Sequence, residues 1–331
     1  MAAAAATTPS ARRSKNSENV TAGGRDPRPR ALLPGVFARR GSLSQILCAV
    51  PITVSLAIAA PAAAQSIARG AYLAEAAGCD HCHTDAERQG RPYAGGRALD
   101  TPFGTAWSPN ITPDPETGIG RWRFADFERA LRWGISPDDS HYLPVFPFPF
   151  FDRLTTEHVA DLKAFLDSLP AVSQVNRSEG AGVISAVRAR AAVVVLAEPF
   201  PGPLAPDPAK SEGWNRGAYL TATVGRCGDC HTPRNWLGAR DPRRAFSGGS
   251  AGPGGKAAPN ITPDPQTGIG DWTEDDIVTL LTSGQTPEFD FVGGPMTEIV
   301  RNTSRLDDAD RRAIAVYLKS LPPVVAQKRG R

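Results

Sequence analysis

Two cysteine pairs, each followed directly by a histidine, have a spacing that predicts chemistry. The two Cys-x-x-Cys-His motifs comprise Cys79, Cys82, His83, Cys227, Cys230 and His231. This is the spacing of c-type haem attachment, because the two cysteines reach both thioether positions of one porphyrin while the adjoining histidine ligates the iron. We therefore predict two covalently bound haem c groups, attached through the four cysteines and ligated by His83 and His231.

Two alternatives use the same residues. A structural zinc site needs ligands from both pairs to converge on one metal, although each pair lies inside its own copy of a longer repeat. A redox-active disulfide does not require the histidine twice. Haem attachment is therefore the interpretation that explains all six residues.

The motifs belong to a long internal repeat. The segment RGAYL begins at Arg69 and again at Arg216, ahead of each cysteine pair. Residues 110–120, NITPDPETGIG, return as NITPDPQTGIG at 260–270, an offset of 150 residues. Because proline, glycine and asparagine dominate this segment, it predicts an ordered loop rather than a helix.

Each copy of the loop is followed by two predicted helices. The first covers Phe124–Trp133 and Glu274–Thr282, with Thr273 as a predicted N-cap. The second has an apolar stripe and covers Thr155–Ser168 and Asp307–Ser320. Each second helix ends at Ser-Leu-Pro, since proline cannot continue a helix. With no alternating strand pattern, each unit predicts an all-α fold wrapped on a haem.

These elements divide the chain into five predicted parts. They are a targeting segment at 1–64, a class I cytochrome c domain at 65–172, a linker at 173–211, a second such domain at 212–325, and a tail at 326–331. The linker has a predicted helix at 186–196, whose apolar run is too short for a membrane span and contains two arginines.

The first 64 residues have the order of a secretory signal. Arg39-Arg40 precede an apolar run at 46–60, and Ala62-Ala63-Ala64 precede Gln65 as a cleavage site. Haem attachment outside the cytoplasm agrees with export to the periplasm. Removal of this segment takes away Cys48 and leaves 29 basic and 32 acidic residues, a net charge of −3. We therefore do not expect a nucleic-acid partner.

The doubled RGAYL…CxxCHT, NITPDPxTGIGxW and Ser-Leu-Pro segments resemble the dihaem cytochrome c subunits that accept electrons from periplasmic dehydrogenases. The resemblance covers about residues 66–325. It implies a quinoprotein, flavoprotein or molybdenum dehydrogenase as donor, an oxidase or small cytochrome as acceptor, and attachment to the inner membrane through a partner. Many members have a third haem domain or a membrane anchor, and we expect neither in the mature chain.

The sixth iron ligands differ between the two copies. Met1 and Met296 are the only methionines, so Met296 is predicted to ligate the second haem. The offset of 150 residues places Phe146 at the equivalent position of the first copy, where the family pattern has methionine. His141 is the candidate sixth ligand of the first haem. The alternatives are a solvent-facing or propionate-bonding His141 and a five-coordinate first haem.

Several other residues have two interpretations. Polar and aromatic loop residues either hydrogen-bond haem propionates or pack the loop: Tyr93, Asn110, Trp122, Asn260 and Trp272. The aromatic run 146–151 is predicted to be a wall of the haem pocket rather than a partner surface.

An electron carrier is the function that these features predict, because no catalytic acid and base pair, phosphate loop or nucleophile arrangement stands out. One alternative is a haem enzyme that uses an open first haem for peroxide or a sulfur compound. A haem-based sensor is a further alternative, although no transmitter domain is evident.

Overall fold

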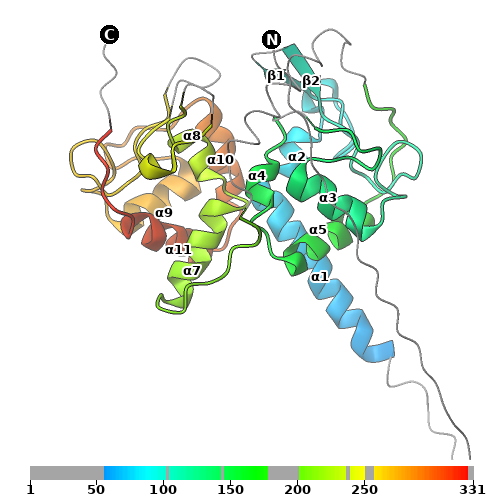
Figure 1. The fold of residues 1–331 in the computed structure, drawn as a ribbon, viewed down its shortest axis with the longest axis horizontal. Helices are drawn as coiled ribbons and strands as arrows, with labels where there is room; N and C mark the ends of the chain where they lie inside the picture. Colours follow the sequence, from blue (N-terminus) through cyan, green and yellow to red (C-terminus); the bar gives the residue numbers. More distant parts are fainter. Residues whose placement is uncertain are drawn as a thin grey trace, which may run out of the picture. The chain divides into compact units, whose positions relative to one another are not determined.

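Helices form nearly all of the regular structure in this computed structural model (Figure 1). The described residues are 56–101, 104–142, 145–177, 201–235, 239–249 and 257–326, all within one unit, Ile52–Arg331. The α-helices are α1 (Leu56–Ala77), α2 (Cys79–Cys82), α3 (Phe124–Trp133), α4 (Phe148–Phe151), α5 (Thr156–Ser168), α7 (Glu212–Ala222), α8 (Cys227–His231), α9 (Glu274–Ser283), α10 (Pro295–Thr303) and α11 (Asp308–Lys319). Two 3-10 helices are η2 (Ala86–Arg88) and η3 (Pro242–Arg244).

A small antiparallel sheet departs from the purely helical prediction. Strands β1 (Ala98–Thr101) and β2 (Gly104–Trp107) pair with Ala98 opposite Trp107. Strands of four residues are too short to produce a recognisable alternation of apolar and polar side chains. The observed fold is therefore mostly helical with one two-stranded sheet.

The predicted helices form where the local capping signals lie. Thr155 is the N-cap of α5, where its side chain accepts a hydrogen bond from the His158 N–H over 3.2 Å. Thr273 caps α9 in a reciprocal capping box with Asp276. Helix α3 ends at Gly134, whose φ of 64° is the left-handed conformation that favours glycine.

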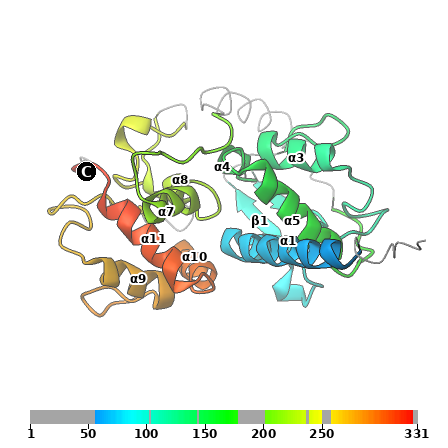
Figure 2. The ribbon, with the colours of Figure 1, turned by 90° about the horizontal axis from the view of Figure 1, so that it is seen from below.

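Two helix pairs pack by the same device. Helix α1 lies along α5, and α7 lies along α11 (Figure 2). A Cβ atom on Gly70 would lie 2.0 Å from the Asp161 carbonyl oxygen, and one on Gly217 would lie 1.9 Å from the Ala313 carbonyl oxygen. The glycine of each RGAYL segment therefore permits a helix approach that any side chain would block.

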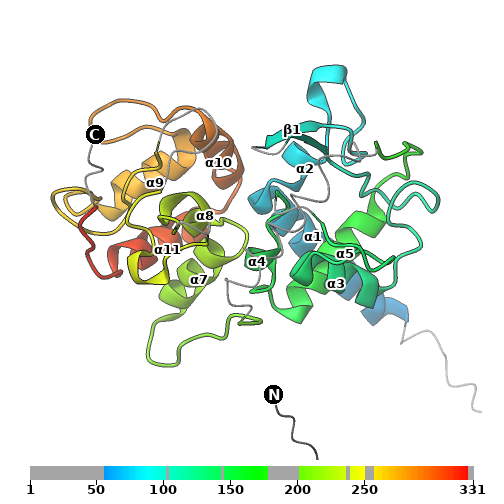
Figure 3. The same cartoon turned by 45° about the horizontal axis from the view of Figure 1, so that its top comes forward.

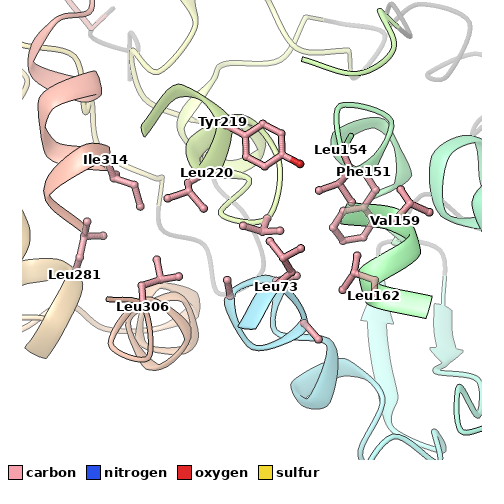
Figure 4. Close-up of a cluster of buried hydrophobic side chains, with 14 of the residues drawn as sticks. Leu73, Phe151, Leu154, Val159, Leu162, Tyr219, Leu220, Leu281, Leu306 and Ile314 are labelled. Atoms are coloured by element: carbon pink, nitrogen blue, oxygen red, sulfur yellow. The ribbon is translucent and has the colours of Figure 1, made fainter. Parts of the chain in front are cut away.

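The buried core brings together equivalent residues of the two repeats. Leu73 and Leu220, from the two RGAYL segments, are 1% and 0% exposed. Figure 4 shows both in a hydrophobic cluster with Leu162 of α5 and Ile314 of α11. The cluster therefore contains side chains from both copies.

The tyrosine of the first RGAYL segment contacts the second repeat. The Tyr72 hydroxyl donates to the Asp310 carboxylate over 2.6 Å and accepts from the Asp307 N–H over 3.0 Å. Asp307 is the N-cap of α11, and Asp310 also accepts two hydrogen bonds from Arg216. Tyr72 therefore completes the hydrogen bonding at the start of a helix more than 230 residues later in the chain.

The tyrosine of the second segment makes the reciprocal contact. The Tyr219 hydroxyl accepts from the Thr155 N–H over 3.2 Å and lies 2.5 Å from Nδ1 of His158. Thr155 and His158 lie in the first turn of α5, at the positions that Asp307 and Asp310 hold in α11. Each RGAYL tyrosine thus binds the closing helix of the other repeat.

Two predictions lie wholly or partly outside the described residues. The linker helix at 186–196 is not described, nor is the chain before residue 56. The predicted cleavage site lies within α1, and the side chains of residues 62–65 are exposed there. None of the helices that the structure describes is long and apolar enough to span a bilayer.

Candidate functional site

Both cysteine motifs begin directly after a left-handed residue. Gly78, with φ of 69°, precedes Cys79, and Arg226, with φ of 48°, precedes Cys227. Each residue is the N-cap of the short helix that carries the cysteines, α2 or α8. None of the four described cysteines forms a disulfide, so all four sulfurs can serve as attachment points for a porphyrin.

The two motif histidines have matching hydrogen bonds. His83 Nδ1 donates to the Pro109 carbonyl over 2.8 Å, and His231 Nδ1 donates to the Pro259 carbonyl over 2.7 Å. Because a carbonyl only accepts, Nδ1 carries the proton and Nε2 has the free lone pair that a metal needs. Burial lowers the pKa of both histidines and favours the neutral ring. These donors fit haem iron.

The loop after each motif is fixed by a buried asparagine. The Asn110 amide donates to the Val172 carbonyl over 2.8 Å, and Asn260 donates to the Val324 carbonyl over 2.7 Å. The side-chain oxygen of each asparagine accepts a hydrogen bond from the backbone N–H two residues later, over 2.9 Å in both repeats. These bonds support the loop-packing interpretation of both asparagines and hold the adjoining Pro109 and Pro259 beside the histidines.

An aromatic residue with positive φ recurs near each motif. Tyr93 has φ of 61° and Phe246 has φ of 64°. The Tyr93 N–H donates to the Thr84 hydroxyl and the Phe246 N–H donates to the Thr232 hydroxyl, both over 3.1 Å. Phe246 was not predicted from the sequence, although the YAGG segment at Tyr93 and the matching FSGG segment at Phe246 indicate the equivalence.

The offset of 150 residues holds in the turn that precedes Phe146 and Met296. A backbone bridge joins Ile135 to His141, and another joins Gln285 to Phe291 at an offset of 150 residues. His141 is exposed at this turn. Its role as sixth ligand of the first haem stays a prediction.

Phe146 and Met296 lie in different local structures. Phe146 is half-buried, with its ring centroid 5.8 Å from that of Tyr142 and 5.7 Å from that of Phe151. Met296 is the second residue of α10, which the sequence did not predict. The Met296 side chain is half-buried. Two residues earlier, Gly294 is the N-cap of α10 and has a φ of 61°.

The first attachment helix contacts the helix that carries Met296. His81 Nδ1 lies 2.9 Å from the Glu298 carboxylate, and Arg305 donates to the Asp80 carboxylate over 3.3 Å. His81 and Asp80 lie between the cysteines of the first motif, whereas Glu298 lies in α10. No local sequence pattern predicts this contact, because its partners are more than 200 residues apart.

A zinc site shared by the cysteine pairs is not supported. Among the residues that the structure describes, no group of three or more His, Cys, Asp or Glu side chains is arranged to hold a metal ion. The pairs occupy α2 and α8, each with its own histidine. Each motif is therefore a separate site.

Known proteins are similar to this chain over most of its length, although no family model matches it. It is 43% identical over 264 residues to the dihaem cytochrome c-type protein of Cereibacter sphaeroides, which covers 77% of this chain and 86% of the relative. It is 38% identical over 265 residues to the cytochrome c subunit of the quinone alcohol dehydrogenase of Gluconacetobacter polyoxogenes, covering 78% of this chain and 56% of the relative. It is also 39% identical over 260 residues to the fructose dehydrogenase cytochrome subunit of Gluconobacter japonicus, covering 78% and 53%. The chain thus spans little more than half the length of these two dehydrogenase subunits.

Proposed function

Because this chain belongs to the dihaem c-type cytochromes, we propose that it is a periplasmic carrier that takes single electrons from a dehydrogenase and passes them to the respiratory chain. Haem iron supplies the one-electron redox chemistry. In this proposal residues 65–172 and 212–325 are tandem cytochrome c domains, each with one haem c, joined by a linker at 173–211.

The observation that carries the proposal is that the two motif histidines make the same hydrogen bond through Nδ1. His83 and His231 each use Nδ1 on the carbonyl of a proline that precedes the NITPDP loop, at 2.8 and 2.7 Å. In a metal-bound histidine, the ring nitrogen that does not bind the metal usually donates a hydrogen bond that fixes the ring's orientation. We assign both histidines as proximal ligands, the cysteines as attachment points and Met296 as the second haem's sixth ligand.

The names of relatives support a dehydrogenase as the electron donor. Relatives include cytochrome subunits of alcohol, fructose and gluconate dehydrogenases. The donor proposed for this chain is a quinoprotein, flavoprotein or molybdenum enzyme, and the acceptor is an oxidase or small cytochrome. The chain itself would be a non-catalytic subunit, held near the inner membrane by its partner.

We further propose that electrons move from the first haem to the second. Phe146 occupies the register position of Met296, so the first haem would lack thioether coordination and have the lower potential. In α10, Glu298 pairs with Arg301, and both side chains lie against His81 of the first motif's helix. This contact gives the two sites a direct protein connection.

A haem enzyme is the second candidate, and Phe146 is the observation that favours it. A first haem without a sixth ligand could bind peroxide or a sulfur substrate. Turnover of peroxide or thiosulfate by the purified protein alone would support the enzyme, whereas rapid electron exchange without turnover supports the carrier.

Haem content and export test the proposal first. Haem staining after a denaturing gel, with intact mass, should show two covalent haems on a chain that begins near Gln65. A mass with one haem, or with residues 1–60 retained, contradicts it. Stopped-flow spectroscopy with a reduced quinoprotein dehydrogenase should then show reduction of both haems.

A further inference from the structure

The turn between α9 and α10 presents two phenylalanine side chains to solvent. Phe289 is 81% exposed and Phe291 is 69% exposed. Glu288 and Asp290 flank Phe289, and both are exposed. Exposed aromatic rings among carboxylates, unlike scattered single apolar side chains, indicate a surface that another molecule covers.

Phe289 is also held in a strained backbone conformation. Its φ is 63°, in the left-handed region where bulky side chains are disfavoured and glycine, asparagine and aspartate are tolerated. The turn is well formed, because the Phe289 N–H donates to the Thr286 carbonyl over 2.9 Å and the Thr286 N–H donates to the Asp290 carbonyl over 2.8 Å. A ring that is both strained and exposed points to a role outside the fold.

The first repeat builds the same turn without an aromatic tip. Asp139 occupies the position of Phe289, with φ of 64°, and its N–H donates to the Ser136 carbonyl over 3.0 Å. The Asp139 carboxylate pairs with Arg129. The turn itself therefore does not need phenylalanine.

The two repeats differ in charge around this turn. Residues 271–300 contain seven acidic residues and no lysine, arginine or histidine: Asp271, Glu274, Asp275, Asp276, Glu288, Asp290 and Glu298. The equivalent residues 121–150 contain four acidic residues, four arginines and one histidine. Residues 271–300 of the second repeat therefore contribute only negative charges, of which Glu298 and Asp275 pair with Arg301 and Arg312 from outside this range.

The acidic and aromatic groups share one surface. Helices α9 and α10 lie side by side (Figure 3), and the turn joins them. Phe289 and Asp276, from the first turn of α9, line a common hollow of about 130 Å³. We call the surface formed by Phe289, Phe291, Glu288, Asp290 and Asp276 the acidic tip.

We propose that the acidic tip docks the electron-accepting protein, a small basic cytochrome with an apolar contact area ringed by lysine. This inference rests on the proposed carrier function. Opposite charges steer such encounters, and an aromatic anchor at the centre supplies most of the affinity. Phe291 lies five residues before Met296, so the partner would approach on the side of the second haem's predicted sixth ligand.

Phe289→Asn tests the anchor in the holoprotein. Asparagine tolerates the left-handed conformation, so the variant should fold and its thermal midpoint should rise. Its affinity for immobilised mitochondrial-type cytochrome c, measured by surface plasmon resonance, should fall roughly tenfold. Val175→Asn is the control, because Val175 is a 79% exposed apolar side chain outside the acidic tip, just after the first predicted domain, and the affinity of this variant should equal that of wild type.

A charge-reversed double variant, Glu288→Lys with Asp290→Lys, tests the steering. It should slow association with the same basic cytochrome and flatten the dependence of that rate on salt up to about 0.15 M. Oxidation by ferricyanide, a small acceptor that needs no docking surface, should be the same as in wild type for the uncharged substitutions Phe289→Asn and Val175→Asn. Unchanged association with full salt dependence would overturn the electrostatic part of the inference.

The outcomes distinguish the docking surface from the carrier function. Wild-type affinity and wild-type transfer rates in Phe289→Asn would overturn the docking surface and leave the carrier function standing. A wild-type protein that binds the basic cytochrome through the acidic tip but transfers no electrons to it would support docking and overturn the proposed function.

Discussion

Replacing Tyr72 with phenylalanine should weaken the junction of the two repeats by a predictable amount. The change removes a hydroxyl that donates to Asp310 over 2.6 Å and accepts from the Asp307 N–H over 3.0 Å. A hydrogen bond to a charged group contributes about 1.5–3 kcal/mol, so we expect the free energy of unfolding to fall by about 2 kcal/mol. The thermal midpoint of the holoprotein, followed by circular dichroism, should fall by about 4–8 °C.

Tyr219→Phe is the matched comparison, because Tyr219 makes the reciprocal contact. Its hydroxyl meets His158, whose pKa is lowered by burial and by the nearby Arg216 charge, so the partner is neutral. A hydrogen bond between neutral groups contributes about 1 kcal/mol. Both substitutions keep the aromatic ring, so the Tyr72 variant should lose about twice as much stability as the Tyr219 variant.

The dependence on pH gives a second test of the same contact. Burial opposes ionisation of Asp310, but hydrogen bonds from Arg216 and Tyr72 outweigh it and hold the pKa of Asp310 below its usual value. Such a carboxyl stabilises the fold above its unfolded pKa, and the contribution is lost as pH falls through the folded pKa. The Tyr72→Phe deficit should therefore be full at neutral pH and shrink below about pH 4. Equal losses in the two variants, or a Tyr72→Phe deficit that persists in acid, would refute the reasoning.

Three further predictions concern the haem ligands and the loops. Met296→Ala should lower the potential of the second haem, within the roughly 0.8 V range that axial ligands control; a redox titration in which the higher-potential step is unmoved would contradict the ligand assignment. The first haem should have the lower potential, and spectra of His141→Ala should show whether it changes from low-spin to high-spin; two His/Met signals of similar potential in wild type would be inconsistent with this asymmetry. Asn260→Ala should lower the free energy of unfolding by about 2–3 kcal/mol because it removes buried hydrogen bonds to the Val324 carbonyl and the Thr262 N–H; denaturant unfolding beside Asn110→Ala measures this, and an unchanged midpoint would show that the bonds contribute nothing.

Local sequence was sufficient wherever the determining interactions lie within a few residues. The helix predicted at Phe124–Trp133 is α3 with the same bounds, and Thr273 is the N-cap of α9. Helix caps and periodic apolar faces act over one to four residues, so they are readable in the chain. The haem motifs and the repeat register also follow from spacing alone.

Short elements were not predicted, because packing rather than propensity decides them. Helix α4 contains Phe-Pro-Phe-Phe, the strands β1 and β2 have four residues each, and α10 begins at Pro295 after two glycines. None of these segments has a periodic signal long enough to stand out. Their buried neighbours select the conformation in the folded chain.

The sequence by itself determined the two Cys-x-x-Cys-His motifs and the mostly helical character of the regular structure. Only the tertiary structure decided which carbonyl orients each histidine, which helix each RGAYL tyrosine binds, and that Phe289 is exposed at a strained turn. The physical reason is distance along the chain: Pro109 lies 26 residues from His83, and Asp310 lies 238 residues from Tyr72. Such partners meet only in the folded chain, and no local pattern specifies that contact.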